Sequence, residues 1–192
     1  ISIYGYTEFK NEIDSFGEVK FILSTWNMPT IDLDIVKKYL PNLKAIFYAG
    51  GNINYFAKPF KKLGVKIYSY ENINAIPVAE YTLAQILLAN KGYFQSSNTY
   101  KSYLWNYSYK NSRKHTFSRM GNFQANIGLI GCGNIGFKLA KLLTQFDLNI
   151  YIYDPYISKA KIEKLGAKSV SLKEIFINCD IISNHLADTV QT

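Results

Sequence analysis

A glycine-rich segment in the second half of the chain constrains the fold more than any other feature of the sequence. Gly131, Gly133 and Gly136 form a G-x-G-x-x-G pattern that follows an apolar run at residues 127–130. In such a pattern the first glycine allows a tight turn, the second lets the backbone approach a pyrophosphate, and the third lets a helix pack closely on a strand. The following residues, 135–146, repeat apolar side chains at helical spacing. The segment therefore predicts a strand, a phosphate-binding turn and a helix whose positive end favours a phosphate.

An acidic residue, Asp154, ends the next apolar run, roughly 20 residues after the last glycine. A carboxylate at that point can accept hydrogen bonds from the ribose hydroxyls of an adenosine, and its charge repels a 2′-phosphate. We therefore predict NAD, and not NADP, as the cofactor. The alternative, in which the glycines only form an ordinary strand-to-helix turn, is weakened by the strand before them and the helix and acid after them.

Composition restricts the class of protein. Of the 192 residues 48% are hydrophobic, which is enough for a packed core and argues against general disorder. The formal charge is +8, but the lysines are scattered and arginine occurs only at Arg113 and Arg119. Proteins that recognise duplex DNA usually depend on arginine. We therefore interpret the charge as compositional bias and predict no nucleic-acid partner.

The two cysteines, Cys132 and Cys179, fall in or beside predicted elements of an α/β fold and form no disulfide framework. No apolar run reaches the length of about 18 residues that a membrane helix needs. The start of the sequence lacks the pattern of a signal peptide. We therefore expect a cytoplasmic protein without a membrane segment.

Strands and helices alternate along the chain, which predicts parallel sheets. Strands are expected at 17–24, of the buried type, and at 43–48, 65–68, 127–130, 168–170 and 181–184. Helices are expected at 33–40, at 74–90 with Asn74 as a possible cap and Pro77 in the first turn, at 158–165 and at 172–177. The expected architecture is α/β: residues 1–92 form a smaller flavodoxin-like substrate domain, and residues 93–192 form an incomplete Rossmann-type, doubly wound parallel sheet.

Residues 91–124 interleave aromatic and basic side chains, among them Tyr93, Tyr100, Tyr109 and Arg113. Such a mixture can form a stacking platform for single-stranded nucleic acid, but no recognisable binding signature accompanies it. We favour a connecting helix and arm that pack against another domain or subunit, because aromatic residues are common at interfaces.

Four blocks of the sequence, in this order, resemble the family of D-isomer-specific 2-hydroxyacid dehydrogenases. They read LKAIFYAGG, NAIPVAEYTLAQILLA, IGLIGCGNIG with YDP, and CDIISNHLADTVQT. The resemblance implies an NAD-dependent oxidoreductase, a small D-2-hydroxy or 2-oxo acid as substrate, and a homodimer.

The same resemblance assigns roles to individual residues. Gly50 and Gly51 would face the substrate carboxylate and the nicotinamide. The cofactor would lie along Gly131, Gly133, Asn134, Ile135 and Gly136, with Asp154 on the adenosine ribose and His185, Leu186 and Ala187 on the adenosine side. A histidine beside a nicotinamide can also move protons, but the matched position of His185 favours a structural or cofactor-lining role.

The catalytic groups of the family are an arginine and a histidine paired with a glutamate, and they follow the strand that ends at His185. No arginine follows Arg119. We therefore expect that residues 1–192 are part of a longer protein, contain no catalytic residue and turn over little substrate alone. The alternative is a non-catalytic, NAD-binding protein similar to the corepressors that share the fold. No H-E-x-x-H, C-x-x-C or G-x-S-x-G motif occurs, so we expect neither a metal nor another catalytic chemistry.

Overall fold

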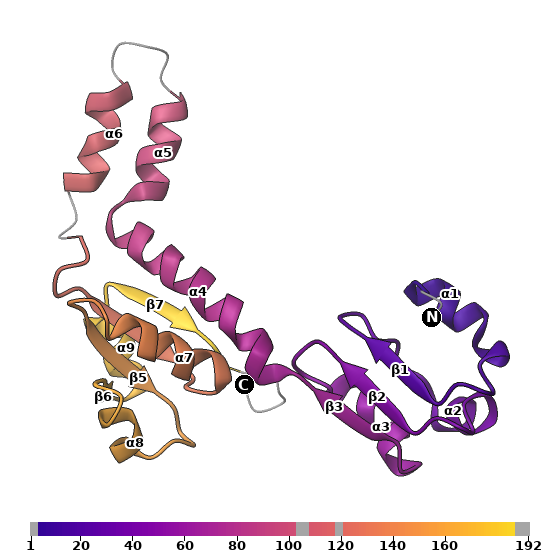
Figure 1. Ribbon diagram of the computed structural model, residues 1–192. Coiled ribbons are helices and arrows are strands. Elements are labelled where there is room, and N and C mark those ends of the chain that lie inside the picture. Colours follow the sequence, from indigo (N-terminus) through magenta and orange to yellow (C-terminus); the bar gives the residue numbers. More distant parts are fainter. Residues whose placement is uncertain (1–3, 103–107, 118–120, 187–192) are drawn as a thin grey trace. The chain divides into compact units, whose positions relative to one another are not determined.

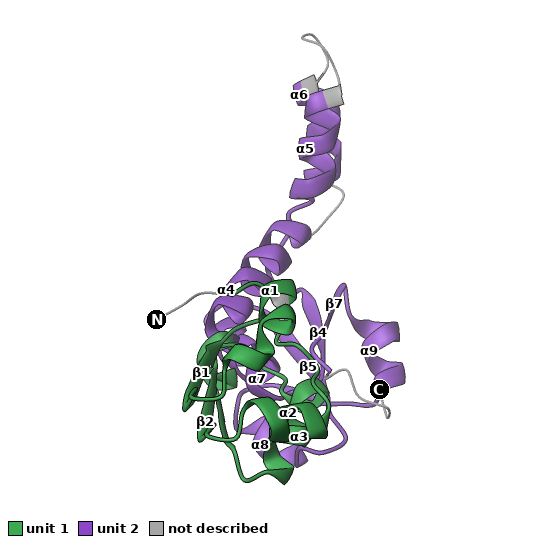
Figure 2. Ribbon diagram, turned by 90° about the vertical axis from the view of Figure 1, so that its right-hand side faces the viewer, with its two compact units in different colours: residues 1–74 green, residues 75–192 purple. Residues whose placement is uncertain are grey.

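The computed structural model describes residues 4–102, 108–117 and 121–186 (Figure 1). The chain divides into two compact units, residues Ile1–Asn74 and Ala75–Thr192 (Figure 2), and each is described by itself. The division falls within helix α4 (Glu71–Asn90), whereas the domain boundary predicted after residue 92 lies beyond the other end of that helix. That boundary stays a prediction. Among the described residues, no helix is both long enough and apolar enough to cross a membrane.

Unit 1 is built on a parallel sheet with the strand order β1-β2-β3. The strands are β1 (Phe21–Ser24), β2 (Ala45–Tyr48) and β3 (Lys66–Ser69). The helices are α1 (Tyr6–Asn11), the short 3-10 helix η1 (Ile13–Ser15), α2 (Leu33–Tyr39) and α3 (Asn54–Lys62). Each parallel connection contains a helix, as parallel strands require.

Among the described residues of unit 1, the large buried side chains lie on one face of this sheet. Ile46 and Tyr48 of β2 pack there with Val36 of α2 and with Phe56 and Phe60 of α3, all of them buried. The register places Phe21 and Leu23 of β1, Phe47 of β2 and Tyr68 of β3 on the opposite face. There Phe21 and Leu23 are 58% and 71% exposed, so the expectation of a fully buried strand at 17–24 is wrong.

Unit 2 is built on a second parallel sheet, with the strand order β6-β5-β4-β7. Its strands are β4 (Asn126–Ile130), β5 (Asn149–Tyr153), β6 (Lys168–Ser169) and β7 (Ile181–Asn184). The chain proceeds outward from β4 through β5 to β6 and then crosses back to the other side of β4. Open α/β sheets bind ligands at such a reversal, beyond the carboxyl ends of the strands.

Helices cover both faces of the second sheet, as the doubly wound expectation requires. Residues from α4, α7 (Asn134–Leu143) and α8 (Lys159–Glu163) share a core with one face, which includes Ile127, Leu129 and Ile152. Helix α9 (Leu172–Asn178) packs on the other face, where Ile175 and Cys179 lie against Gly128 (Figure 1). The predicted α/β class with parallel sheets is confirmed.

Helices α5 (Tyr93–Ser102) and α6 (Ser108–Phe117) lie side by side as a hairpin (Figure 1). Polar side chains hold the two helices together. The Ser96 hydroxyl donates to the carbonyl oxygen of Ser112 at 2.7 Å, and Thr99 Oγ1 lies 2.9 Å from His115 Nε2. Tyr93, Phe94, Tyr100 and Tyr109 of the hairpin remain exposed.

Two local predictions differ from the structure. Helix α4 begins at Glu71, so Asn74 is not its cap and Pro77 lies inside the helix. A proline there removes the hydrogen bond to the carbonyl of Ile73, and Ile73 is 63% exposed, where water can serve that carbonyl. Helix α7 ends at Leu143, which leaves Phe146 beyond the helix and exposed.

Candidate functional site

The glycine turn connects the carboxyl end of β4 to the first turn of α7. Gly131 has a φ of +90°, which favours glycine. A Cβ at Gly131 would lie 2.9 Å from the carbonyl oxygen of His185, and a Cβ at Gly136 would overlap the carbonyl oxygen of Gly131. The turn is therefore packed between the start of α7 and the residue that follows β7, and it has no room for a larger side chain at either glycine.

Gly133 has different surroundings, because no atom lies within 4 Å of a Cβ placed there. It is the N-cap residue of α7, and no side chain caps the helix at this end. Asn134 and Ile135 form the first helical turn. A helix N-terminus without a side-chain cap, reached over an open glycine, provides backbone N–H donors and a positive dipole end for a phosphate. These three residues therefore fit the pyrophosphate role predicted for them.

The Asp154 carboxylate lies directly after β5, beside the glycine turn. Its Oδ2 accepts the backbone N–H of Cys132 at 2.7 Å. Its Oδ1 accepts the backbone N–H groups of Tyr156 at 2.8 Å and Ile157 at 3.2 Å. A carboxylate offers about four lone-pair positions, so Asp154 is fixed in orientation and keeps a position on Oδ2 for a ribose hydroxyl.

His185 closes the other side of the turn. Its backbone N–H donates to the carbonyl oxygen of Ile130 at 2.7 Å, and its Nε2 lies 2.9 Å from Ser183 Oγ. Burial lowers the pKa of this histidine. A half-buried imidazole held in this way fits a structural or cofactor-lining position.

The next two predicted residues complete this edge. The backbone N–H of Leu186 donates to Asn184 Oδ1 at 3.1 Å and also lies close to Gly131. Ala187 lies outside the described residues. The structure therefore gathers Gly131, Gly136, His185 and Leu186 in one place, and the Asp154 carboxylate reaches the same turn at Cys132.

Two neighbours of the turn were not predicted as site residues. The Cys132 thiol is buried, and burial together with the Asp154 carboxylate raises its pKa, whereas the Lys161 ammonium acts in the opposite direction. Lys161 extends from α8, and its Nζ lies 5.8 Å from the centroid of the Phe137 ring. No spacing rule marks such a lysine, because its proximity depends on how α8 packs beside α7.

Gly50 and Gly51 follow β2 in unit 1. A Cβ at Gly50 would lie 2.7 Å from ring atoms of Tyr48, and a Cβ at Gly51 would lie 3.9 Å from Asn74 Nδ2. The close approach at Gly50 is a structural reason for a glycine there. Their predicted contact with substrate stays a prediction.

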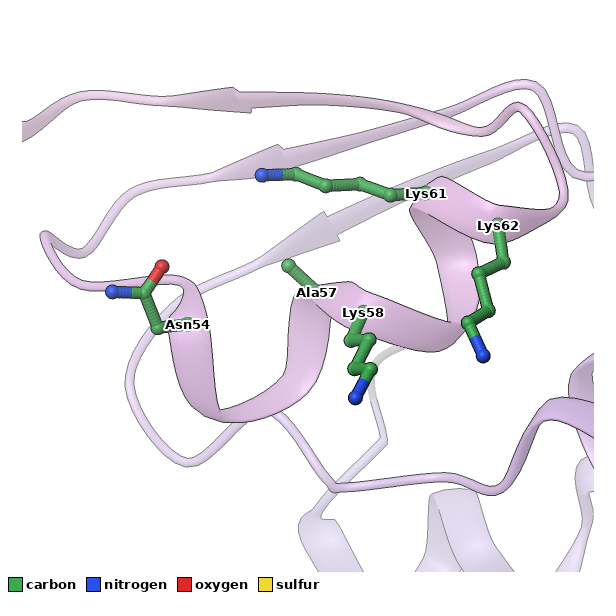
Figure 3. A pocket seen from close by; sticks show the side chains of 5 residues that line it. All are labelled: Asn54, Ala57, Lys58, Lys61 and Lys62. Carbon is green, nitrogen blue, oxygen red and sulfur yellow. The ribbon is translucent and has the colours of Figure 1, made fainter.

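A surface depression in unit 1, of about 380 Å³, is lined by Asn54, Ala57, Lys58, Lys61 and Lys62 of α3 (Figure 3). In Figure 3 the side chains of Lys58 and Lys62 point to one side of the helix and Lys61 extends along another. The three cations do not converge, so this depression is no anion site comparable to the glycine turn.

A parallel sheet whose strand order reverses, a glycine turn at the carboxyl end of the strand where it reverses, and an acid at the end of the neighbouring strand define a dinucleotide-binding α/β domain. Residues 83–192 match the family model "D-isomer specific 2-hydroxyacid dehydrogenase, NAD binding domain". The chain belongs to this family, which confirms the predicted resemblance, and NAD is the cofactor that its domain takes.

Individual relatives agree with this assignment. D-3-phosphoglycerate dehydrogenase of Mycobacterium leprae is 27% identical over 85% of this chain, and that of Bacillus subtilis is 27% identical over 80%. The chain spans 30% and 28% of the length of these two relatives. The crystal structure of D-mandelate dehydrogenase of Rhodotorula graminis matches 100% of this chain and 59% of its own with a TM-score of 0.83, at 18% identity. NAD-dependent formate dehydrogenase of Staphylococcus aureus matches 95% and 53% with a TM-score of 0.70, at 23% identity.

Proposed function

We propose that the protein is an NAD-dependent oxidoreductase that transfers a hydride between NAD and a small D-2-hydroxy or 2-oxo acid. The observation that carries the proposal is the glycine turn of a family member, open at Gly133 and flanked by the oriented carboxylate of Asp154. The nicotinamide supplies the hydride-transfer chemistry, and the protein supplies binding and orientation.

Different residues of this chain bind different parts of the cofactor and the substrate. The amides at the start of α7 hold the pyrophosphate, with Asn134 and Ile135 along it. Asp154 accepts hydrogen bonds from the hydroxyls of the adenosine ribose. His185, Leu186 and Ala187 line the adenosine side. Gly50 and Gly51 face the substrate carboxylate and the nicotinamide. We assign none of the residues described here to catalysis.

A second candidate is a non-catalytic NAD-binding protein similar to a corepressor. The residues described here account for cofactor binding and include none that is assigned to catalysis, so they fit this candidate as well. Both candidates require NAD, but only the first requires turnover of a hydroxy acid.

One experiment on the full-length protein distinguishes the two candidates. NAD and NADH binding is measured by calorimetry, and NADH oxidation is followed by absorbance with glyoxylate, pyruvate and phenylpyruvate. Binding with turnover of at least one 2-oxo acid supports the dehydrogenase. Binding without any turnover supports the second candidate, and absence of NAD binding contradicts both.

The cofactor role of Asp154 gives a sharper prediction. We expect Asp154→Ala to lower the ratio of NAD affinity to NADP affinity by about tenfold. A change of this size corresponds to the free energy of one hydrogen bond to a charged group. The matched control is Asp180→Ala, because Asp180 Oδ2 also accepts a backbone N–H, that of Asn126 at the opposite end of β4, at 2.8 Å. Both variants lose stability, but the control keeps the wild-type ratio. An unchanged ratio in Asp154→Ala would show that the acid does not read the ribose.

We also propose a cytoplasmic homodimer. The free thiols of Cys132 and Cys179 support a reducing compartment. The exposed aromatic side chains of the α5–α6 hairpin support a subunit contact.

A further inference from the structure

We propose that Lys161 is a second charged determinant of cofactor choice, whose ammonium serves the 2′-phosphate of NADP so that the site prefers NAD without excluding NADP. This inference rests on the proposed function, because Lys161 acts only where the glycine turn and Asp154 hold a dinucleotide.

The position of Lys161 follows from the order of elements. The loop after Asp154 leads within a few residues to Ser158, the N-cap of α8, and Lys161 is the third residue of that helix. Its Nζ lies 5.8 Å from the centroid of Phe137, which directly follows Gly136 in the first half of α7. A cation from α8 therefore lies beside the helix that begins at the glycine turn.

Asp154 and Lys161 act on the same point of the turn. Cys132 lies between the first two glycines, and its backbone N–H is bound by Asp154. The Asp154 carboxylate raises the pKa of the Cys132 thiol and the Lys161 ammonium lowers it. Both charges are thus within electrostatic range of one buried side chain of the turn.

The charge of Lys161 is available to a ligand. Lys159, two residues earlier, pairs with Glu163 at 3.7 Å. Over the ranges that the structure describes, Lys161 forms no ion pair with a carboxylate. Its ammonium lies over the ring of the partly buried Phe137 at 5.8 Å from the centroid. Such a contact is weak at a solvent-accessible site, so the flexible side chain can exchange it for a phosphate.

The chemistry of a 2′-phosphate requires such a compensating charge. The phosphate adds a charge of about −1.5 to −2 on the ribose whose hydroxyls donate hydrogen bonds to Asp154. Three backbone N–H groups fix Asp154, so its carboxylate does not turn away from the added charge. Any tolerance of NADP must therefore come from another residue, and Lys161 is a cation that the packing of α8 brings beside α7 and within Coulombic range of Cys132.

The test measures the affinities of NAD and NADP for the full-length protein by calorimetry. The variant is Lys161→Gln, and Lys159→Gln is the control on the same helix. We expect Lys161→Gln to weaken NADP binding by about fivefold or more, as for one charged contact of about 1 kcal/mol, and to change NAD binding by less than about twofold. Lys159→Gln should change neither affinity.

The same pair of measurements is made in the Asp154→Ala background, where NADP binding is stronger. There too the Lys161→Gln substitution should selectively weaken NADP binding. An equal decrease in the affinities for NAD and NADP would place Lys161 on the pyrophosphate that the two cofactors share and would overturn the inference. Unchanged affinities, or NADP binding that is undetectable in both backgrounds, would also overturn it. Wild-type protein that binds neither cofactor would instead contradict the proposed function.

Discussion

Gly133 and Gly136 belong to the same turn, yet an added Cβ would meet different surroundings at each. At Gly136 it would overlap the carbonyl oxygen of Gly131, and at Gly133 it would enter open space. Gly133 also has a φ of −71°, which any residue adopts. Gly136 therefore serves packing, and Gly133 serves access for a ligand.

We expect the two alanine substitutions to separate stability from binding. Gly136→Ala should lower the free energy of unfolding by about 1–3 kcal/mol, the range for overpacking. Gly133→Ala should change stability by no more than about 0.5 kcal/mol but weaken NAD binding, because the methyl group occupies space at the pyrophosphate. Chemical denaturation and calorimetry measure the two quantities. Equal stability loss in both variants, or unchanged NAD affinity in Gly133→Ala, would contradict this division.

His185 gives the stability of the protein a pH dependence of known sign. Burial lowers its pKa in the folded protein below the ordinary value of 6.5, so the unfolded chain binds the proton more readily. The neutral His185 imidazole makes its full contribution to the free energy of unfolding above pH 6.5. This contribution decreases as the pH falls from 6.5 toward the lower pKa of the folded state.

We therefore expect the wild-type protein to lose more stability than His185→Gln between pH 7.5 and pH 5. The variant has no imidazole to protonate at this position, so it lacks this part of the slope. Denaturation midpoints at a series of pH values measure the difference, and parallel curves for the two proteins would contradict it.

At the residue scale the sequence predicted the glycines and Asp154 because their spacing follows from one continuous strand-turn-helix-strand segment. Lys161 and the backbone partners of Asp154 could not be predicted in this way. Their positions depend on the packing of α8 and on the loop that follows β5, and neither leaves a periodic signal in the sequence.

At the scale of elements, apolar patterns located the strands but did not reveal which faces are covered. The apolar run at 17–24 reads as buried, yet β1 has a core on one side only, and Phe21 and Leu23 lie on the open face. Burial of a strand requires a helix on each face, and the pattern within the strand contains no information about helices elsewhere. The strands of unit 2 were predicted closely because the cofactor motif fixes their order.

The α5–α6 hairpin depends on one glycine at the start of α5. Gly92 has a φ of +66°, and a Cβ there would overlap the carbonyl oxygen of His115 in α6. Gly121 is a matched control, because its φ is +80° but a Cβ would meet only the flexible end of Lys91 at 3.5 Å. Both substitutions with alanine introduce backbone strain, and only Gly92→Ala also separates the two helices.

We expect Gly92→Ala to increase hydrogen exchange in peptides from 93–102 and 108–117 while the sheet of unit 2 keeps its protection. Gly121→Ala should leave exchange in the hairpin unchanged and cost about 1–2 kcal/mol of left-handed strain. Hydrogen exchange detected by mass spectrometry measures both. Equal protection of the hairpin in Gly92→Ala and wild type would show that the close approach does not hold the helices together.

At the scale of the whole molecule, the hairpin exposes the kind of surface that a subunit contact covers. Tyr93 and Tyr100 are seven residues apart on one face of α5 and are 50% and 57% exposed, and Tyr109 of α6 is 65% exposed. Neither helix contains an acidic residue, and together they carry Lys101, Lys110, Arg113 and Lys114. Two hairpins packed directly on each other would bring like charges together, so we expect each hairpin to contact another part of the partner subunit.

The proposed homodimer can be tested through the tyrosines of α5. We expect Tyr93→Ser combined with Tyr100→Ser to weaken self-association of the full-length protein by about tenfold or more, since tyrosine is enriched among the interface residues whose truncation costs about 2 kcal/mol or more. The control is Phe176→Ser on α9, which removes an aromatic side chain that is 64% exposed outside the hairpin. Sedimentation equilibrium over a range of concentrations measures the dissociation constant. A monomeric wild type, or a double variant that associates as tightly as the control, would show that the exposed tyrosines of the hairpin do not form the subunit contact.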